Sequence, residues 1–152
     1  MIKLNFLLLL VADLFMSCNP NYVFNDFNSN FESNRWNSNE EVVFEFDNEN
    51  DIKVSSINLH IRHIYDFQFA NVPTEVIIIF PNGSNEKFHL DVKYKDETGK
   101  ELGQCSGDIC DLYTPITSNI NLRKGKYKFI VKNKFPSSFL PNVLGVGILI
   151  EK

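Results

Sequence analysis

Apolar and polar residues alternate with a period of two over much of this 152-residue chain. In the segment SINLHIRHI, residues 56–64, the apolar Ile57, Leu59 and Ile61 alternate with polar residues. This alternation predicts a β-strand with one buried face. The segment EVIIIF, residues 75–80, is continuously apolar, which is typical of a strand buried on both faces.

Turn-forming residues separate further strand-like segments. The sequence PNGS at residues 81–84 places Asn-Gly where a tight turn needs positive φ. The segments 115–122 and 127–131 are joined by RKGK and predict a hairpin. No stretch of 11 or more residues shows a helical period, so we expect an all-β chain folded as an antiparallel β-sandwich, immunoglobulin-like or jelly-roll-like. The remaining predicted strands are residues 40–46, 86–95 with Phe88, Leu90, Val92 and Tyr94 inward, and 145–152.

The first 17 residues have the features of an export signal. Lys3 supplies the positive end, Phe6–Ala12 is apolar, and the small residue Ser17 directly precedes Cys18. A lipoprotein signal peptide needs a small residue before a cysteine that carries diacylglycerol. An ordinary secretory signal with a chance cysteine is the alternative, but the position of Cys18 favours lipidation. Two or more acyl chains anchor a protein stably, since each buried CH₂ contributes about 0.8 kcal/mol.

The segment directly after Cys18 differs in composition from the rest of the chain. Residues 18–39 are rich in Asn and Ser and are predicted to be a lipid-anchored tether whose later part docks onto the domain. Trp36 lies in this segment and is expected to cover an edge of the core rather than to stack on a ligand. Residues 40–152 are predicted to form the β-sandwich domain.

The formal net charge is -4, and no basic stripe is visible. Nucleic-acid binding therefore has no electrostatic support. His60 and His63 are three apart on a predicted strand, so their rings point to opposite faces, and we expect neither a metal site nor a cofactor. His89 is expected to point outward from its own strand.

Cys105 and Cys110 flank a short loop, CSGDIC. An exported compartment permits a disulfide between them, although two unpaired thiols in a loop remain the alternative. The spacing does not match a zinc site. Serine-hydrolase and phosphate-binding motifs are absent from the sequence, and we expect a protein that is not an enzyme. The GVG segment, residues 145–147, is expected to allow close backbone approach or a bulge.

Arg62 lies on the polar side of a predicted strand, just before an aromatic cluster of Tyr65, Phe67 and Phe69. We expect its guanidinium to pack against those rings or to pair with a carboxylate. The hypothesis for a contact surface is the set Arg62, Phe67, Phe69 and Asn71, because aromatic side chains stand there beside polar strand ends.

A set of short motifs follows one order along the chain. The motifs, in order, are Cys18, Trp36, LHIRH (59–63), YDFQFANV (65–72), FPNG (80–83), LDVKY (90–94), TGKELG (98–103), GDI (107–109), GKY (125–127) and GVGILIEK (145–152). This order resembles the gliding-motility lipoprotein family GldH of the Bacteroidota, and the terminal motif GVGILIEK is the most specific part of the resemblance. The resemblance implies an accessory lipoprotein of surface gliding that acts beside the envelope machinery of the type IX secretion system.

We therefore expect a lipoprotein that faces the periplasm and binds other envelope proteins of the gliding or secretion apparatus. The sequence leaves open whether the inner or the outer membrane carries the anchor. The alternative is a module that binds envelope glycans or peptidoglycan, since a sandwich with edge aromatics can stack sugar rings.

Overall fold

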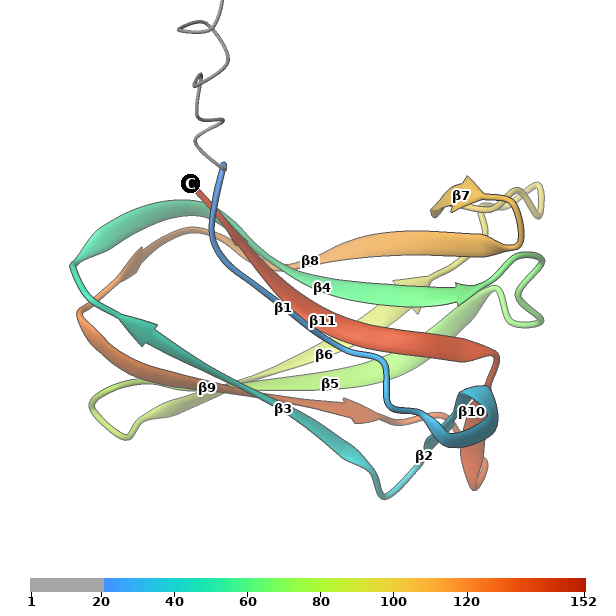
Figure 1. Ribbon diagram of the computed structural model, residues 1–152, viewed down its shortest axis with the longest axis horizontal. Helices are drawn as coiled ribbons and strands as arrows, with labels where there is room; N and C mark the ends of the chain where they lie inside the picture. Colours follow the sequence, from blue (N-terminus) through green and yellow to red (C-terminus); the bar gives the residue numbers. More distant parts are fainter. Residues whose placement is uncertain (1–20) are drawn as a thin grey trace, which may run out of the picture.

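Strands form most of the domain, and they pack as two antiparallel sheets (Figure 1). The computed structural model describes residues 21–152. The predicted signal peptide and Cys18 lie outside the described residues. The elements are β1 (Tyr22–Asn28), the 3-10 turn η2 (Glu32–Asn34), β2 (Arg35–Asn37), β3 (Glu41–Asn48), β4 (Ile52–Ile64), β5 (Asn71–Ile79), β6 (Asn85–Lys93), β7 (Gln104–Ser106), β8 (Ile109–Leu122), β9 (Gly125–Asn133), β10 (Phe139–Pro141) and β11 (Val143–Glu151).

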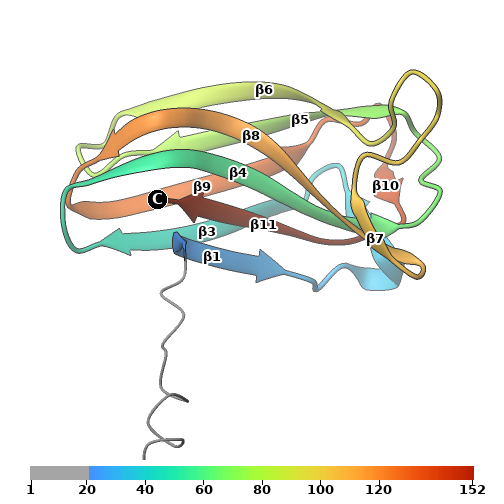
Figure 2. The ribbon, with the colours of Figure 1, turned by 90° about the horizontal axis from the view of Figure 1, so that it is seen from above.

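One sheet has five strands in the order β1-β11-β4-β8-β7, and the other has four in the order β3-β9-β5-β6. Figure 2 shows that the strands of both layers run in similar directions, as in aligned sheet packing. A small pair, β10-β2, lies at one end (Figure 1). The predicted antiparallel β-sandwich is confirmed. Within residues 21–152 no helix is long and apolar enough to span a membrane.

The core lies between the inner faces of the two sheets. The alternation predicted for residues 56–64 holds, because Ile57, Leu59 and Ile61 of β4 are buried. The prediction that residues 75–80 are buried on both faces is wrong. Val76 and Ile78 of β5 are buried, whereas Ile77, Ile79 and Phe80 are only partly buried. Within residues 21–152, no further layer covers the outer face of the four-stranded sheet.

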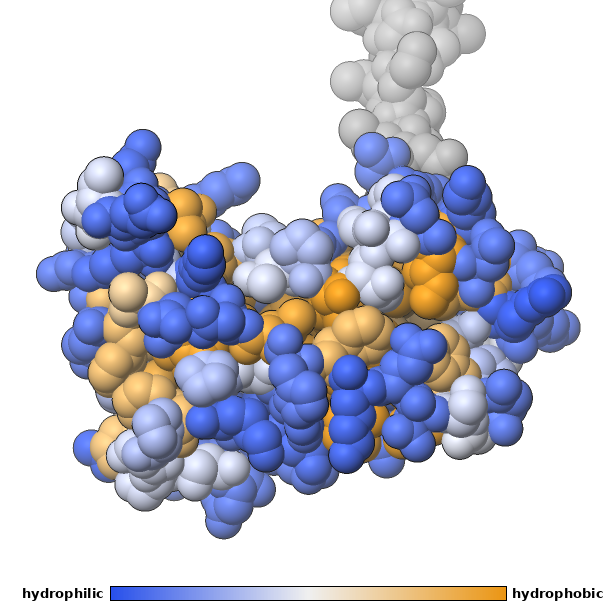
Figure 3. All heavy atoms as spheres, turned by 180° about the vertical axis from the view of Figure 1, so that it is seen from behind, coloured by the Kyte–Doolittle hydropathy of each residue, from blue (hydrophilic) through white to orange (hydrophobic). Residues whose placement is uncertain are grey.

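The sandwich is open along one side, where β6 and most of β8 form the sheet edges. Figure 3 shows this side, and an apolar band crosses it between the sheets. Phe88, Leu90 and Ile120 pack against the core there but are only partly buried. The inward positions predicted for β6 are thus correct, and the edge location limits the burial of Phe88 and Leu90.

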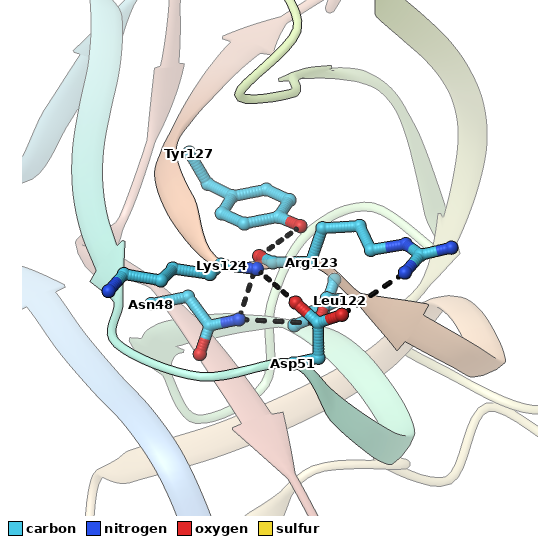
Figure 4. Close-up of polar contacts among 6 residues, drawn as sticks. All are labelled: Asn48, Asp51, Leu122, Arg123, Lys124 and Tyr127. Atoms are coloured by element: carbon cyan, nitrogen blue, oxygen red, sulfur yellow. Dashed lines mark hydrogen bonds and ion pairs between the residues drawn. The ribbon is translucent and has the colours of Figure 1, made fainter.

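The hairpin predicted from residues 115–131 is wrong. β8 pairs with β4 in one sheet, whereas β9 pairs with β3 and β5 in the other, so the chain crosses between layers at Arg123 and Lys124. Buried Asn48 donates hydrogen bonds to the carbonyl oxygens of Leu122 (3.3 Å) and Arg123 (2.8 Å) (Figure 4). Asp51 accepts a hydrogen bond from the Lys124 N–H at 2.8 Å. These contacts satisfy backbone groups that a hairpin ladder would have paired.

The same crossing is held by Tyr127, whose hydroxyl donates to the Arg123 carbonyl oxygen at 3.0 Å (Figure 4). The hydrogen bond from the Lys124 backbone, followed by that from Arg123, lowers the pKa of Asp51. The turn predicted over RKGK, residues 123–126, is shorter in the structure, because only Arg123 and Lys124 connect the strands and Gly125 already begins β9. Turn residues alone do not indicate which sheet the next strand joins.

The prediction that residues 18–39 form a tether is wrong for most of this segment. β1 pairs with β11 from Tyr22 to Asn28, and β2 pairs with β10. Trp36 is fully buried, and its indole N–H donates to the Glu40 carbonyl oxygen at 3.0 Å. The docking of the later part and the core-covering role of Trp36 are confirmed. The domain begins at Tyr22 rather than at residue 40.

Candidate functional site

Arg62 lies on the outer face of the five-stranded sheet, where it forms a two-point ion pair with Asp111 of β8. Arg62 Nε is 2.8 Å from Asp111 Oδ1, and Nη2 is 3.1 Å from Oδ2. The guanidinium carbon lies 5.2 Å from the ring centroid of Phe27 in β1. The predicted pairing with a carboxylate is confirmed. The aromatic ring that the guanidinium packs against belongs to Phe27, however, and not to the aromatic cluster that follows β4.

His60 occupies the same face of β4, two residues earlier. Its Nε2 is 2.6 Å from Asp111 Oδ1. The imidazole lies between two rings, with centroid distances of 4.8 Å to Phe27 and 4.4 Å to Tyr113. We name these residues the outer-face cluster: Phe27, His60, Arg62, Asp111 and Tyr113. They come from β1, β4 and β8, and the strand register brings them together.

Two glycines of β11 make room for Phe27 to reach across the sheet. Phe27 is the register partner of Gly147, and its ring lies over the backbone of β11. A Cβ atom at Gly147 would lie 2.8 Å from Phe27 Cδ2, and one at Gly145 would overlap the same ring. The close backbone approach predicted for the GVG segment is confirmed, and it lets a β1 residue contact β4 side chains across an intervening strand.

The protonation states within the cluster follow from its contacts. Burial lowers the pKa of His60, and this outweighs the upward effect of its hydrogen bond with Asp111. Burial raises the pKa of Asp111, but hydrogen bonds from Arg62 and His60 leave that pKa below its usual range. The Asp111 hydrogen bond raises the pKa of Arg62. At neutral pH the cluster therefore holds a charged Arg–Asp pair and a neutral imidazole, to which we assign the Nε2 proton because the carboxylate only accepts.

The titration of His60 provides a first prediction. The ring is expected to titrate below the ordinary value of about 6.5, so the unfolded chain binds this proton more tightly than the folded chain. The stability that depends on neutral His60 is complete above about pH 6.5 and declines as the pH falls toward the folded pKa. NMR titration of the assigned imidazole signals measures this, and a His60 pKa above the ordinary value would contradict it.

Asp111→Asn is the matched variant for that titration. It replaces the carboxylate that raises the pKa of His60 by a neutral amide, so this pKa should fall further. The variant should also lose about 1–2 kcal/mol of unfolding free energy, because Arg62 loses a charge-assisted pair.

The predicted contact surface of Arg62, Phe67, Phe69 and Asn71 is not one surface. Phe67 is only 1% exposed and stacks on Tyr94 with ring centroids 4.2 Å apart. Phe69 is partly buried and packs against the core. Asn71 is exposed in the other sheet, where its side chain donates to Asp91 at 2.6 Å. The chain turns inward after β4 at Asp66, whose φ is 57°, and this carries the aromatic residues into the core.

The histidines lie as predicted from strand alternation. His60 faces outward, whereas His63 is fully buried on the inner side and packs against Phe67 and Tyr94. His89 is exposed, and its Nδ1 is 3.6 Å from Glu75 Oε2. Residues 21–152 contain no group of three or more His, Cys, Asp or Glu side chains arranged to hold a metal ion.

The sequence of residues 23–150 matches the profile of the GldH lipoprotein family. The chain belongs to this family. A gliding motility lipoprotein GldH homolog from Christiangramia forsetii is 26% identical over 155 residues, which cover 97% of this chain and 94% of the relative. The resemblance inferred from the ordered motifs is confirmed, and membership in the GldH family identifies a membrane-anchored lipoprotein related to gliding motility.

The chain also matches parts of larger solved structures. A family GH115 4-O-methyl-α-glucuronidase matches with a TM-score of 0.39 at 12% identity, over 90% of this chain and 18% of the enzyme. A CocE/NonD family hydrolase from Staphylococcus aureus matches with a TM-score of 0.38 at 12% identity, over 87% of this chain and 31% of the hydrolase. This chain thus spans less than a third of each of these proteins, and at such scores the likenesses carry no functional inference.

In this GldH family member Cys105 and Cys110 form a disulfide, and the two residues are direct register partners across β7 and β8. Cys110 is buried and Cys105 is exposed. The alternative of two unpaired thiols is thereby set aside. Cys18, the predicted lipidation site, lies outside the described residues.

Three buried side-chain atoms have no hydrogen-bond partner within residues 21–152: His63 Nε2, Tyr94 Oη and Glu101 Oε2. Burial raises the pKa of Tyr94. An unpartnered buried hydroxyl costs stability, whereas a partnered one does not. The end of the sandwich that carries β7 therefore includes an energetic cost that a fully paired core would avoid.

Tyr94→Phe tests this cost directly. Removing the hydroxyl should leave the unfolding free energy unchanged or raise it by about 1 kcal/mol. Tyr127→Phe is the matched control, because its hydroxyl does have a partner, the Arg123 carbonyl oxygen, and it should lose about 1 kcal/mol. Urea unfolding of both variants measures the difference, and equal losses would contradict the assignment.

Proposed function

We propose that this GldH family lipoprotein is a non-catalytic accessory component of the gliding machinery, anchored through lipid on Cys18 and facing the periplasm. It acts beside the type IX secretion apparatus by binding other envelope proteins. Family membership supports the link to gliding. The small residue before Cys18 and the apolar run that precedes it support lipidation at that position.

The outer-face cluster is the observation that carries the binding role. Its charged groups satisfy one another through the Arg62–Asp111–His60 contacts, so no free base or nucleophile results from the arrangement. Tyr113 is nevertheless 44% exposed, and the Arg62 side chain is 41% exposed. A fixed guanidinium edge beside an aromatic ring suits protein recognition, since Arg and Tyr are enriched among residues that dominate binding energy.

Tyr113→Ala in native cells tests this proposal. The variant should reduce gliding and the recovery of crosslinked envelope complexes. Its melting temperature should fall no more than that of Val43→Ala, a matched control at a residue 43% exposed on a strand of the other sheet. Cys18→Ser should release the protein from the membrane fraction and also abolish gliding. Normal gliding and unchanged complexes in Tyr113→Ala would refute the binding role of this face.

Binding of envelope glycan is the second candidate, and the exposed ring of Tyr113 beside a charged pair favours it. Sugar rings stack on aromatic faces while their hydroxyls bond to charged groups. A pull-down on purified sacculi distinguishes glycan binding from protein binding. Retention of the native chain and loss of retention in Tyr113→Ala would favour glycan, and no retention of the native chain would remove this candidate.

A further inference from the structure

The end of the sandwich that carries β7 exposes apolar side chains. Tyr65, Leu102 and Ile109 are 55%, 48% and 45% exposed. The Tyr65 N–H donates to the Asp108 carbonyl oxygen at 2.9 Å, so Tyr65 lies beside the start of β8, where Ile109 begins the strand. Leu102 lies at the same end, because the preceding Glu101 bridges to Lys95, and Lys95 pairs with Asp66, which follows Tyr65. We name Tyr65, Leu102 and Ile109 the tip surface. Clustered apolar exposure on a folded domain marks interaction sites.

The tip surface continues into the outer-face cluster. Ile109, Asp111 and Tyr113 alternate along β8, so their side chains point to the same face of the sheet. Ile109 therefore continues the outer-face cluster toward the end of the domain.

The loops that present the tip surface are held in place before any partner binds. The disulfide joins Cys105 to Cys110 next to Ile109. Asp96 Oδ1 accepts hydrogen bonds from the Thr98 N–H at 2.8 Å and the Lys100 N–H at 3.0 Å. Little conformational freedom is then lost on association, which favours binding.

A hollow of about 750 Å³ adjoins Leu102 at this end. Its walls carry both apolar and charged groups, and Lys95 among them is already paired with Asp66 at 2.7 Å. A hollow of this size can accept a long side chain of a partner. The lining residues are Ala70, Asn71, Asp91, Lys93, Lys95, Asp96, Glu97, Thr98 and Leu102.

The charges of these loops are predominantly negative. Glu97 and Asp108 make no ion pair within the described part of the chain. Both are exposed, so both carboxylates are available to a partner. The loop residues that carry charge are Asp66, Asp96, Glu97, Glu101 and Asp108 against Lys95 and Lys100.

We propose that the tip surface docks an envelope protein whose apolar contact is rimmed by Lys and Arg. The apolar side chains of Tyr65, Leu102 and Ile109 form the centre of this interface, Glu97 and Asp108 form its acidic rim, and a basic side chain of the partner enters the hollow beside Leu102. Complementary charge at a rim of this kind directs encounter and fixes register. The inference rests on the proposed function, because it assigns the partner's contact chemistry and extends the binding face to this end of the domain.

The position of the tip surface fits a partner in the aqueous space rather than the bilayer. Tyr22, the start of the domain, is the register partner of Glu151, and Glu151 in turn pairs with Ser56 near the beginning of β4. The tip surface begins after Ile64, at the other end of β4. Figure 2 shows β7 at the end of the sandwich away from the start of β1.

Site-specific photocrosslinking in native cells tests the proposal on the full-length lipoprotein. A photoreactive phenylalanine analogue replaces Leu102, Tyr113 or, as a control on the other sheet, Val43. The crosslinked peptide is sequenced by mass spectrometry. At position 102 we expect one captured protein whose linked peptide carries Lys or Arg beside apolar residues, and at position 43 no capture.

Charge reversal tests the rim. Glu97→Lys together with Asp108→Lys should reduce the crosslinking yield at position 102 at least tenfold. The melting temperature should not fall, because neither carboxylate is ion-paired. Lys→Glu at the mapped peptide of the partner should restore the yield. Capture of lipid, of a second copy of this chain, or of a peptide without basic residues overturns the proposal.

The outcomes also separate this inference from the proposed function. Capture at position 113 but not at 102 overturns the tip surface while the binding role stands. No capture at either position, with normal gliding in Tyr113→Ala, overturns both.

Discussion

A chain that begins at Glu40 will fail to fold, whereas one that begins at Asn21 will fold. The shorter chain lacks β1, which pairs with β11 along its length, and it lacks the buried side chains of Phe31 and Trp36. Loss of a single buried aromatic side chain costs about 3–5 kcal/mol. A typical domain is stable by only about 5–15 kcal/mol. The loss of two buried aromatic side chains together with a strand is therefore expected to remove most or all of this stability.

Circular dichroism and two-dimensional NMR of the two purified chains measure this result. The chain from Asn21 is the control, since it retains every described strand and lacks the predicted signal and lipidation site. A cooperative thermal transition in the chain from Glu40, with the same midpoint as the control, would show that residues 21–39 are dispensable.

Gly145→Ala will destabilise the domain by about 2–3 kcal/mol, as expected for overpacking. The added methyl group would overlap the Phe27 ring and approach the Asn28 carbonyl oxygen to 2.9 Å. Neither group can move freely, because β1 is held to β11 by its backbone ladder. Urea unfolding measures the change in unfolding free energy.

A double-mutant cycle identifies the cause. Phe27→Ala in the Gly145→Ala background should recover part of the lost stability, so the two effects will not add. Recovery should remain incomplete because the contact with the Asn28 carbonyl oxygen persists. Strict additivity of the two single changes would mean that the Phe27 ring is not what excludes a side chain at residue 145.

Local patterns were sufficient to predict β3, β4, β5, β6, β9, β11 and the second half of β8, but not β1, β2, β7 or β10. Alternation in β4 identified its buried residues correctly, since a half-buried strand imposes a period of two. The crossing between β8 and β9 was missed because the choice of sheet depends on long-range contacts, here those of Asn48 with residues 122 and 123. β1 was read as tether because the sequence YVFNDFN of an edge strand contains polar residues that face solvent.

The candidate site could be predicted only in part. Arg62 was identified, and a carboxylate partner was expected for it. Asp111 is 49 residues away in sequence, and no spacing rule connects them. Phe67 and Phe69 were assigned to the surface because the inward turn at Asp66 interrupts the strand period, and aromatic composition alone does not distinguish a surface from a core.

The early start of β1 sets how far this domain can work from its bilayer. If Cys18 carries the lipid, the linker of four residues from there to Tyr22 can span no more than about 14 Å. β4, at 13 residues, extends about 43 Å along the sandwich. On the proposed anchoring, the domain would act as a short, rigid spacer, and a partner bound to it would lie within about one molecular length of the membrane.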